Sequence, residues 1–376
     1  MKLQHWRASQ ANNAVQAAPT LEFDQWELLE TRFPFALSLS KGQLGYVESM
    51  DSSICASTGS ARTGIFRSSP MKAPRRAISG VLLLDKHAEL SSNTAVGWAK
   101  RLFNADKAGH TGTLDPFATG LLPICFGEAA KFARFMLDAE KAYRATLKLG
   151  QKSSTGDTEG EIIETRAVNV DIGKVNAVLA KFIGTQTQIP PMHSALKQGG
   201  VPLYKLARQG LEVERAPREI TVIALHAVSL AGDELVIDTL VSKGTYIRVL
   251  AENIGEALGC GAYLTALRRT ATGGFGLAQA VTLESLDALA IEARDQRLLP
   301  ADALAMALPE IRLDETQAKA LQNGKTPRVA ASLLAAAHYR AYDDEGAFLG
   351  VATASECDAH GATLTALRLM APTPVA

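Results

Sequence analysis

The stretch GHTGTLDPFATG, residues 109–120, holds one carboxylate, Asp115, in a loop rich in glycine and threonine. Its three glycines allow backbone conformations that a side chain would forbid, and Pro116 biases Asp115 toward an extended conformation. The stretch therefore predicts an acid that a loop presents to its surroundings. The alternative is a connecting loop in which Asp115 caps the following helix.

The segments around this loop predict an α+β fold. The continuous apolar run at residues 80–85 favours a strand, and the next segment favours a helix that reaches Phe103, with Ser92 or Asn93 as its N-cap. Residues 143–149 alternate apolar and polar, as in a half-buried strand with a basic outer face. Strands and helices follow one another without a regular βαβα rhythm, which favours a mixed sheet over a doubly wound parallel one.

The length predicts more than one folded domain. The chain has 376 residues, of which 47% are hydrophobic and 21% charged, as in globular proteins that are too long for one compact core. We expect a poorly ordered extension at residues 1–75, a main domain at 76–300 and a small β-rich domain at 301–376. Met71 offers an alternative start, so the preceding residues are expected to be dispensable or wrongly assigned.

The net charge gives no sign of a nucleic-acid partner, because Lys+Arg and Asp+Glu number 39 each. An RNA-binding surface must therefore come from local clustering of basic side chains. One such cluster lies, in the sequence, on both sides of the loop at residues 109–120, which we call the opening loop. Its members are Lys100, Arg101, Lys107, Lys131, Arg134, Lys141, Arg144 and Lys148.

Several other classes of protein and site are disfavoured. Zinc sites of the Cys-x-x-Cys type and disulfide frameworks need closely spaced cysteines, whereas these are Cys55, Cys125, Cys260 and Cys357. No apolar run is long enough to span a bilayer, and the N-terminus lacks the order of a signal peptide. No glycine-rich nucleotide motif is present. We therefore expect a cytoplasmic protein without a nucleotide cofactor.

Two further segments contain side chains that could suggest a metal. Asp157 and Glu159 lie in a turn-rich segment, but the twelve-residue calcium pattern and its closing glutamate are missing. We expect a solvated turn there. Met192 and His193 have no His or Cys partner at ligand spacing, so we expect them to be wall residues.

Short motifs follow one another in a fixed order on both sides of the opening loop. They are Gly80-Val-Leu-Leu-Leu-Asp-Lys86, Ser91-Ser-Asn93, Leu122-Pro-Ile-Cys-Phe-Gly-Glu128, Lys141-Ala-Tyr143-Arg, Ile189-Pro-Pro-Met, Ser194-Ala-Leu-Lys197, Ser242-Lys-Gly-Thr-Tyr246-Ile-Arg248 and Leu267-Arg-Arg269. Together with Gly-His-Thr-Gly-x-Leu-Asp-Pro they resemble the TruB family of bacterial tRNA pseudouridine synthases. The segment after Pro300 loosely resembles the PUA type of RNA-binding domain.

The resemblance implies an α+β pseudouridine synthase fold with a mixed, mainly antiparallel sheet around a central active-site cleft. It also implies an isomerisation in which uracil leaves C1′, rotates and rejoins through C5, with no cofactor and no metal. The substrate implied is the T-arm uridine of tRNA, at position 55. No membrane and no obligatory protein partner are implied, so a monomer is expected.

The resemblance also implies roles for particular side chains. Asp115 is the catalytic carboxylate, and Arg248 pairs with it, which should lower its pKa. Tyr143 stacks on the flipped base, and Tyr246 forms a second wall of the pocket. Without the resemblance, Tyr143 fits a core tyrosine equally well, and a surface charge is the preferred interpretation of Arg248.

Two more residues are implied to contact the substrate. His110 matches a residue that stacks within the disrupted RNA loop, and Lys86 is expected to pack or to contact a phosphate. The family commonly has Lys-Pro where this chain has Lys86-His87, which leaves the loop after the first strand less rigid. Two other functions remain open at this point: pseudouridine synthesis in another RNA, and RNA binding or tRNA folding on the same scaffold.

Overall fold

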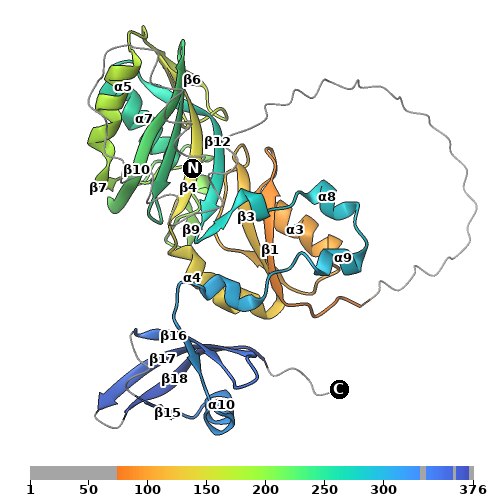
Figure 1. Ribbon diagram of the computed structural model, residues 1–376. Coiled ribbons are helices and arrows are strands. Elements are labelled where there is room, and N and C mark those ends of the chain that lie inside the picture. The colour runs from red at the N-terminus through yellow and green to blue at the C-terminus, as the bar shows by residue number, and fades with distance from the viewer. Residues whose placement is uncertain (1–73, 331–335, 359–360, 372–376) are drawn as a thin grey trace, which may run out of the picture.

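The computed structural model describes residues 74–330, 336–358 and 361–371. They form a large body and a smaller C-terminal body, each built on its own sheet (Figure 1). The prediction of a poorly ordered N-terminal extension falls almost wholly outside the described residues. Among the helices described, none is long and apolar enough to cross a membrane.

The sheet of the large body has nine strands, in the order β1-β3-β12-β4-β11-β10-β7, with β2 beside β3 and β13 beside β12. Only β3 and β12 pair in parallel, and all other pairs in this sheet are antiparallel. The predicted mixed, mainly antiparallel sheet is confirmed. The strands are β1 (Gly80–Lys86), β2 (Ala108–His110), β3 (Thr119–Phe126), β4 (Lys141–Leu149), β7 (Gly184–Gln188), β10 (Arg218–Ala231), β11 (Glu234–Val241), β12 (Ala262–Thr272) and β13 (Phe275–Gly276).

Helices cover both faces of this sheet. The main hydrophobic core lies under α3 (Ser92–Leu102), α5 (Ile172–Leu179), α7 (Ile247–Leu258) and α8 (Leu283–Asp287). A second core on the opposite face lies under η2 (Gly127–Phe132), α4 (Ala133–Leu137) and η5 (Ala301–Ala305). The remaining short elements of this body are β5 (Gln151–Ser153), β6 (Ile162–Thr165), η3 (Ala180–Phe182), β8 (Lys197–Gln198), β9 (Val201–Pro202), α6 (Leu203–Ala207), η4 (Leu277–Gln279) and α9 (Ile291–Asp295).

The two cores explain the sequence patterns of the strands. In β1, Leu82 and Leu84 join the main core, whereas Val81 and Leu83 join the second, so an uninterrupted apolar run is required. In β4 every second residue from Tyr143 to Leu149 is buried, and the residues between them are less so. The predicted half-buried alternation of β4 is confirmed.

Helix α3 begins differently from the prediction. Its N-cap is Ser91, whose hydroxyl accepts a hydrogen bond from the backbone of Thr94. Ser92 or Asn93 was expected to cap the helix, but both lie inside it, and Ser92 is buried with its hydroxyl bonded to the backbone of Leu114. The expected cap was wrong because a loop 22 residues away along the chain competes for the Ser92 side chain.

The C-terminal body is small and mostly β. Its sheet has five strands in the order β14-β16-β17-β18-β15. The elements are β14 (Glu310–Arg312), α10 (Glu315–Gln322), β15 (Arg328–Val329), β16 (His338–Tyr342), β17 (Phe348–Asp358) and β18 (Gly361–Leu369). It contacts the large body through Phe132 of η2, whose ring centroid lies 5.1 Å from that of Phe348. Apolar packing therefore fixes the C-terminal body beside η2 (Figure 1).

Candidate active site

The opening loop is a rigid connection between β2 and β3. The Ser92 hydroxyl accepts from the Leu114 backbone N–H at 2.8 Å and donates to the Leu114 carbonyl at 2.9 Å. The Ala118 N–H donates to the Asp115 carbonyl at 3.1 Å. No helix begins at Asp115, so the loop presents its carboxylate and the capping alternative is wrong.

Arg269 of β12 holds this loop at both ends. Its Nε donates to the Leu121 carbonyl at 2.7 Å and its Nη2 to the Gly112 carbonyl at 3.2 Å. The β12 backbone also approaches Gly120 closely: a Cβ there would lie 2.3 Å from the Arg269 carbonyl oxygen, and φ is +102°. Gly120 is therefore required where β3 and β12 run in parallel.

Arg248 lies at the start of α7 between two carboxylates. Its Nη2 lies 3.1 Å from Oδ2 of Asp115, and its Nη1 lies 3.2 Å from Oδ2 of Asp157. Nη2 also donates to the His193 carbonyl at 2.7 Å. The Arg248 side chain is only 5% exposed, so the surface-charge alternative is wrong.

The pKa of Asp115 departs from the expected direction. Burial against the surrounding protein raises the pKa above its ordinary value and outweighs the attraction of Arg248, and repulsion from Asp157 adds to the rise. Arg248 does favour the charged carboxylate, as expected, but the net lowering that we expected is wrong. The Asp115 side chain remains 36% exposed because it faces an open cavity.

Asp157 is not part of a solvated turn. Its side chain is 2% exposed and bonds with three groups: the Arg248 guanidinium, the Thr155 hydroxyl at 2.5 Å and the Glu159 N–H at 3.0 Å. The prediction failed because the turn faces α7, whose arginine lies 91 residues further along the chain.

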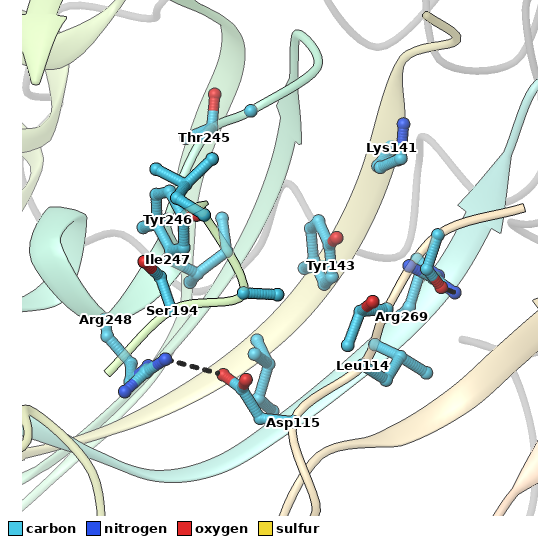
Figure 2. A pocket seen from close by; sticks show the side chains of 16 residues that line it. Leu114, Asp115, Lys141, Tyr143, Ser194, Thr245, Tyr246, Ile247, Arg248 and Arg269 are labelled. Atoms are coloured by element: carbon cyan, nitrogen blue, oxygen red, sulfur yellow. Dashed lines mark hydrogen bonds and ion pairs between the residues drawn. The ribbon is translucent and has the colours of Figure 1, made fainter. Parts of the chain in front are cut away.

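A cavity of about 310 Å³ opens beside the Asp115–Arg248 pair (Figure 2). Tyr143 lies across the cavity from Tyr246 and Arg248, with Asp115 on the side of the loop. The lining residues are Gly112, Thr113, Leu114, Asp115, Lys141, Tyr143, Ser194, Ala195, Leu196, Gly244, Thr245, Tyr246, Ile247, Arg248, Leu267 and Arg269. The structure thus brings four of the six predicted site residues together.

The two tyrosines of the cavity lie in different kinds of secondary structure: Tyr143 is on a strand, and Tyr246 is in the loop before a helix. Tyr143 is on the inward face of β4 and 8% exposed, so it is both a core residue and a wall of the cavity. Tyr246 precedes α7, and its backbone is fixed by two hydrogen bonds with the side-chain amide of Gln188, at 2.8 and 3.1 Å. Burial raises the pKa of Tyr246, so its phenol stays protonated at neutral pH.

Lys86 and His110 do not line the cavity. The Lys86 side chain is fully buried, and its ammonium donates to the carbonyls of His87, Leu90 and Pro116 at 2.7, 2.8 and 3.2 Å. Burial lowers the pKa of Lys86 to about 8. Of the two roles expected for it, this placement supports packing behind the loop and not a phosphate contact.

The His110 ring supports the backbone of the loop. Its Nδ1 accepts a hydrogen bond from the Gly112 N–H at 3.2 Å, and burial lowers its pKa. The ring is half-buried at the end of β2. One part of it therefore remains accessible beside the loop.

Arg269, Lys141 and Ser194 were not predicted to be site residues, although all three line the cavity. Arg268 and Arg269 look alike in the sequence. In the fold Arg268 pairs with Asp85 and is 42% exposed, whereas Arg269 is 1% exposed. Only the alternation of β12 beside β3 distinguishes the inward arginine from the outward one.

Comparisons with known proteins agree with this geometry. Residues 100–247 match the family described as TruB family pseudouridylate synthase (N terminal domain). Residues 248–306 match tRNA pseudouridylate synthase B C-terminal domain, and residues 309–368 match Pseudouridine synthase II TruB, C-terminal.

Curated relatives are similar over nearly their whole length. The chain is 52% identical over 284 residues to tRNA pseudouridine synthase B of Thiobacillus denitrificans, covering 76% of this chain and 95% of the relative. It is 50% identical over 299 residues to the protein of the same name in Neisseria meningitidis serogroup B, covering 80% and 96%.

Solved structures share the fold. A crystal structure of a Cbf5-Nop10-Gar1 complex matches with a TM-score of 0.61 at 25% identity, covering 77% of this chain and 84% of the other. A structure of an H/ACA RNP bound to a substrate RNA containing 2′-deoxyuridine matches with a TM-score of 0.59 at 23% identity, covering 78% and 85%.

Proposed function

Because this chain belongs to the TruB family of pseudouridylate synthases, we propose that it isomerises a uridine of tRNA, the T-arm uridine at position 55, to pseudouridine. The observation that carries this proposal is the Asp115–Arg248 pair, held at 3.1 Å beside a cavity walled by two tyrosines. Binding alone does not require a partly exposed carboxylate that is fixed in this way.

The reaction breaks the bond between N1 and C1′ and forms a bond between C5 and C1′. The proton on C5 is lost to a base, and N1 gains a proton, so the product is an isomer of the substrate. A carboxylate aimed at the nucleotide can act as nucleophile or as base in such a sequence. Burial raises the pKa of Asp115 and makes it a stronger base, while Arg248 holds it in its charged form.

The target uridine has to leave its stack before it reaches Asp115, because the cavity takes a single nucleotide and not a duplex. Tyr143 provides a face on which the flipped uracil stacks, a contact typically worth about 1–3 kcal/mol. Tyr246 closes the opposite wall (Figure 2). His110 remains our candidate for a stacking contact outside the cavity, within the opened RNA loop.

Tyr143→Ala is expected to reduce turnover more than Tyr143→Phe does, because the ring face does the stacking and phenylalanine keeps it. The measurement is single-turnover formation of pseudouridine by both variants. Equal losses would assign the effect to the hydroxyl and contradict stacking. Unfolding temperatures should accompany the rates, because Tyr143 is also a core residue.

The C-terminal body is proposed to bind tRNA outside the T arm. Because η5 is buried in the second core of the large body, we place the junction near Pro309 and not at residue 300. Deleting the residues after Pro309 is expected to raise KM for tRNA by about tenfold and to change kcat much less. Unchanged KM and kcat would show that this body does not contact the RNA.

The proposed activity is tested by incubating the protein with unmodified tRNA transcribed with uridine labelled by tritium at C5. Isomerisation releases this tritium to water, because C5 becomes bonded to C1′. Catalytic release supports the proposal. Tight binding without release would favour RNA binding or tRNA folding, and release only from another RNA would favour a different substrate.

We further propose that the protein acts as a monomer in the cytoplasm.

A further inference from the structure

Two basic side chains, Lys141 of β4 and Arg269 of β12, lie on the side of the cavity opposite Tyr246 and Arg248 (Figure 2). Arg269 is 1% exposed, and Lys141 is half-buried. Neither forms an ion pair with a carboxylate of the described residues. The acidic group that acts on Lys141 is Asp138, whose exposed carboxylate already pairs with Lys243 at 2.7 Å, so this side of the cavity carries an excess of positive charge.

Both side chains retain donors for a ligand. Arg269 donates through Nε and Nη2 to backbone carbonyls, and within the described part of the chain its Nη1 has no hydrogen-bond partner. The Lys141 ammonium donates to the carbonyls of Ala139 and Leu137 at 2.6 and 3.2 Å, which leaves one of its three hydrogens.

The two side chains converge where the opening loop has no side chain. A Cβ at Gly112 would lie 3.7 Å from Nη1 of Arg269 and 3.8 Å from Cε of Lys141. A side chain at this position would therefore reach into the space between the two cations. Glycine leaves that space to the cavity.

Three other members of the predicted basic cluster form ion pairs with carboxylates. Arg144 and Lys148 of the same strand pair with Asp238 and Asp233, and Lys131 pairs with Glu128. Burial, together with repulsion from Arg269, lowers the pKa of Lys141 to about 8. A buried charge is costly unless an opposite charge compensates it, so this pair is expected to recruit an anion.

We propose that Lys141 and Arg269 form a subsite for a backbone phosphate of the RNA, next to the nucleotide that is flipped onto Tyr143. The inference rests on the proposed function for its ligand. Guanidinium and ammonium groups are the usual partners of phosphate oxygens, and in this cavity they lie across Tyr143 from Arg248. The subsite would hold the backbone while Asp115 acts on the nucleoside.

The test is a double-mutant cycle between the protein and the RNA. The RNA is an unmodified T-arm hairpin in which one phosphate flanking the target uridine, on its 5′ or its 3′ side, is replaced by an uncharged methylphosphonate. The variants are Lys141→Gln and, as a control with the same charge change on the same strand, Lys148→Gln. Dissociation constants and single-turnover rates are measured for every combination.

The wild type is expected to lose about tenfold in affinity when the contacted phosphate is neutralised. Lys141→Gln should bind the charged RNA about tenfold more weakly than the wild type does, and neutralising the phosphate should weaken its binding little further. Lys148→Gln should lose affinity on neutralisation as the wild type does. Lys141→Arg should restore most of the affinity. Arg269 is left unchanged in this test because it also holds the loop.

The subsite is overturned if, at both flanking phosphates, the affinity lost through Lys141→Gln and the affinity lost through neutralising the phosphate simply add. Because the cycle reads affinity as well as rate, its failure is distinct from failure of the proposed function. Coupling in affinity without any pseudouridine would keep the subsite and reject the reaction. Pseudouridine formation with additive losses would keep the reaction and reject the subsite.

Discussion

Replacing Asp115 by asparagine is expected to abolish pseudouridine formation, with a fall in kcat of at least about 10³-fold, and to leave tRNA binding within a few-fold. The amide has nearly the same shape but can act neither as nucleophile nor as base. The loop should keep its position, because Ser92, Arg269 and Lys86 hold it through backbone atoms. The measurements are single-turnover rates and the dissociation constant for tRNA.

Asp287→Asn serves as the control for this variant, because Asp287 is an exposed carboxylate outside the cavity and should not affect either measurement. Retained turnover in Asp115→Asn would remove Asp115 from the catalytic role. A large loss of binding together with turnover would make Asp115 a binding residue instead. Either result would require another group in the cavity to carry the reaction.

Replacing Arg248 by methionine is expected to lower kcat at neutral pH by about 100-fold or more and to make the remaining activity rise with pH. The pKa of Asp115 is already raised by burial, and Arg248 opposes that rise. Without the guanidinium, Asp115 also faces Asp157 with no positive charge between them. The pKa of Asp115 should therefore rise further, and less of it is ionised at pH 7.

The pH profile of Arg248→Met shows whether the pKa of Asp115 rises when the guanidinium is removed. A carboxylate is active only above its pKa if it acts as nucleophile or base, so the acidic limb of the Arg248→Met profile should lie at higher pH than that of the wild type. Single-turnover rates between pH 5 and 9 measure it. A profile that is lowered uniformly, without a shift, would show that Arg248 does not act through the ionisation of Asp115.

The same substitution should also reduce stability, because it removes the positive charge that pairs with the buried carboxylate of Asp157. Breaking a buried ion pair on one side typically costs about 3–5 kcal/mol. Thermal unfolding should be measured in parallel, and Arg248→Lys separates the two effects. Lysine keeps the charge but cannot face Asp115 and Asp157 with two nitrogens, so its pH profile should lie between those of the other two proteins.

Local patterns in the sequence predicted the local structure well. The alternation of β4 placed Tyr143 on the inward face. The mixed sheet followed from the order of strands and helices. The alternation of a strand depends on neighbours within a few residues, which a sequence pattern records directly.

The site depends on contacts between distant segments, and there the residues alone were insufficient. The loop pattern predicted only that Asp115 is presented to its surroundings. The catalytic role of Asp115 and the site roles of Tyr143 and Arg248 came from the resemblance to a family. Asp157 was predicted to be solvated because its turn looks polar, and its burial against Arg248 is a tertiary effect. The direction of the Asp115 pKa shift was missed for the same reason, since burial cannot be read from the identity of a neighbour.

Mapping pseudouridine in a tRNA transcript after incubation with the wild-type protein tests the central claim most directly. A transcript with uridine at position 55 and one with cytidine there are compared, with Asp115→Asn as the inactive reference. We predict pseudouridine at position 55 of the first transcript, none in the second, and none with the variant. Pseudouridine at another position, or none in either transcript with tRNA still bound, would contradict the account.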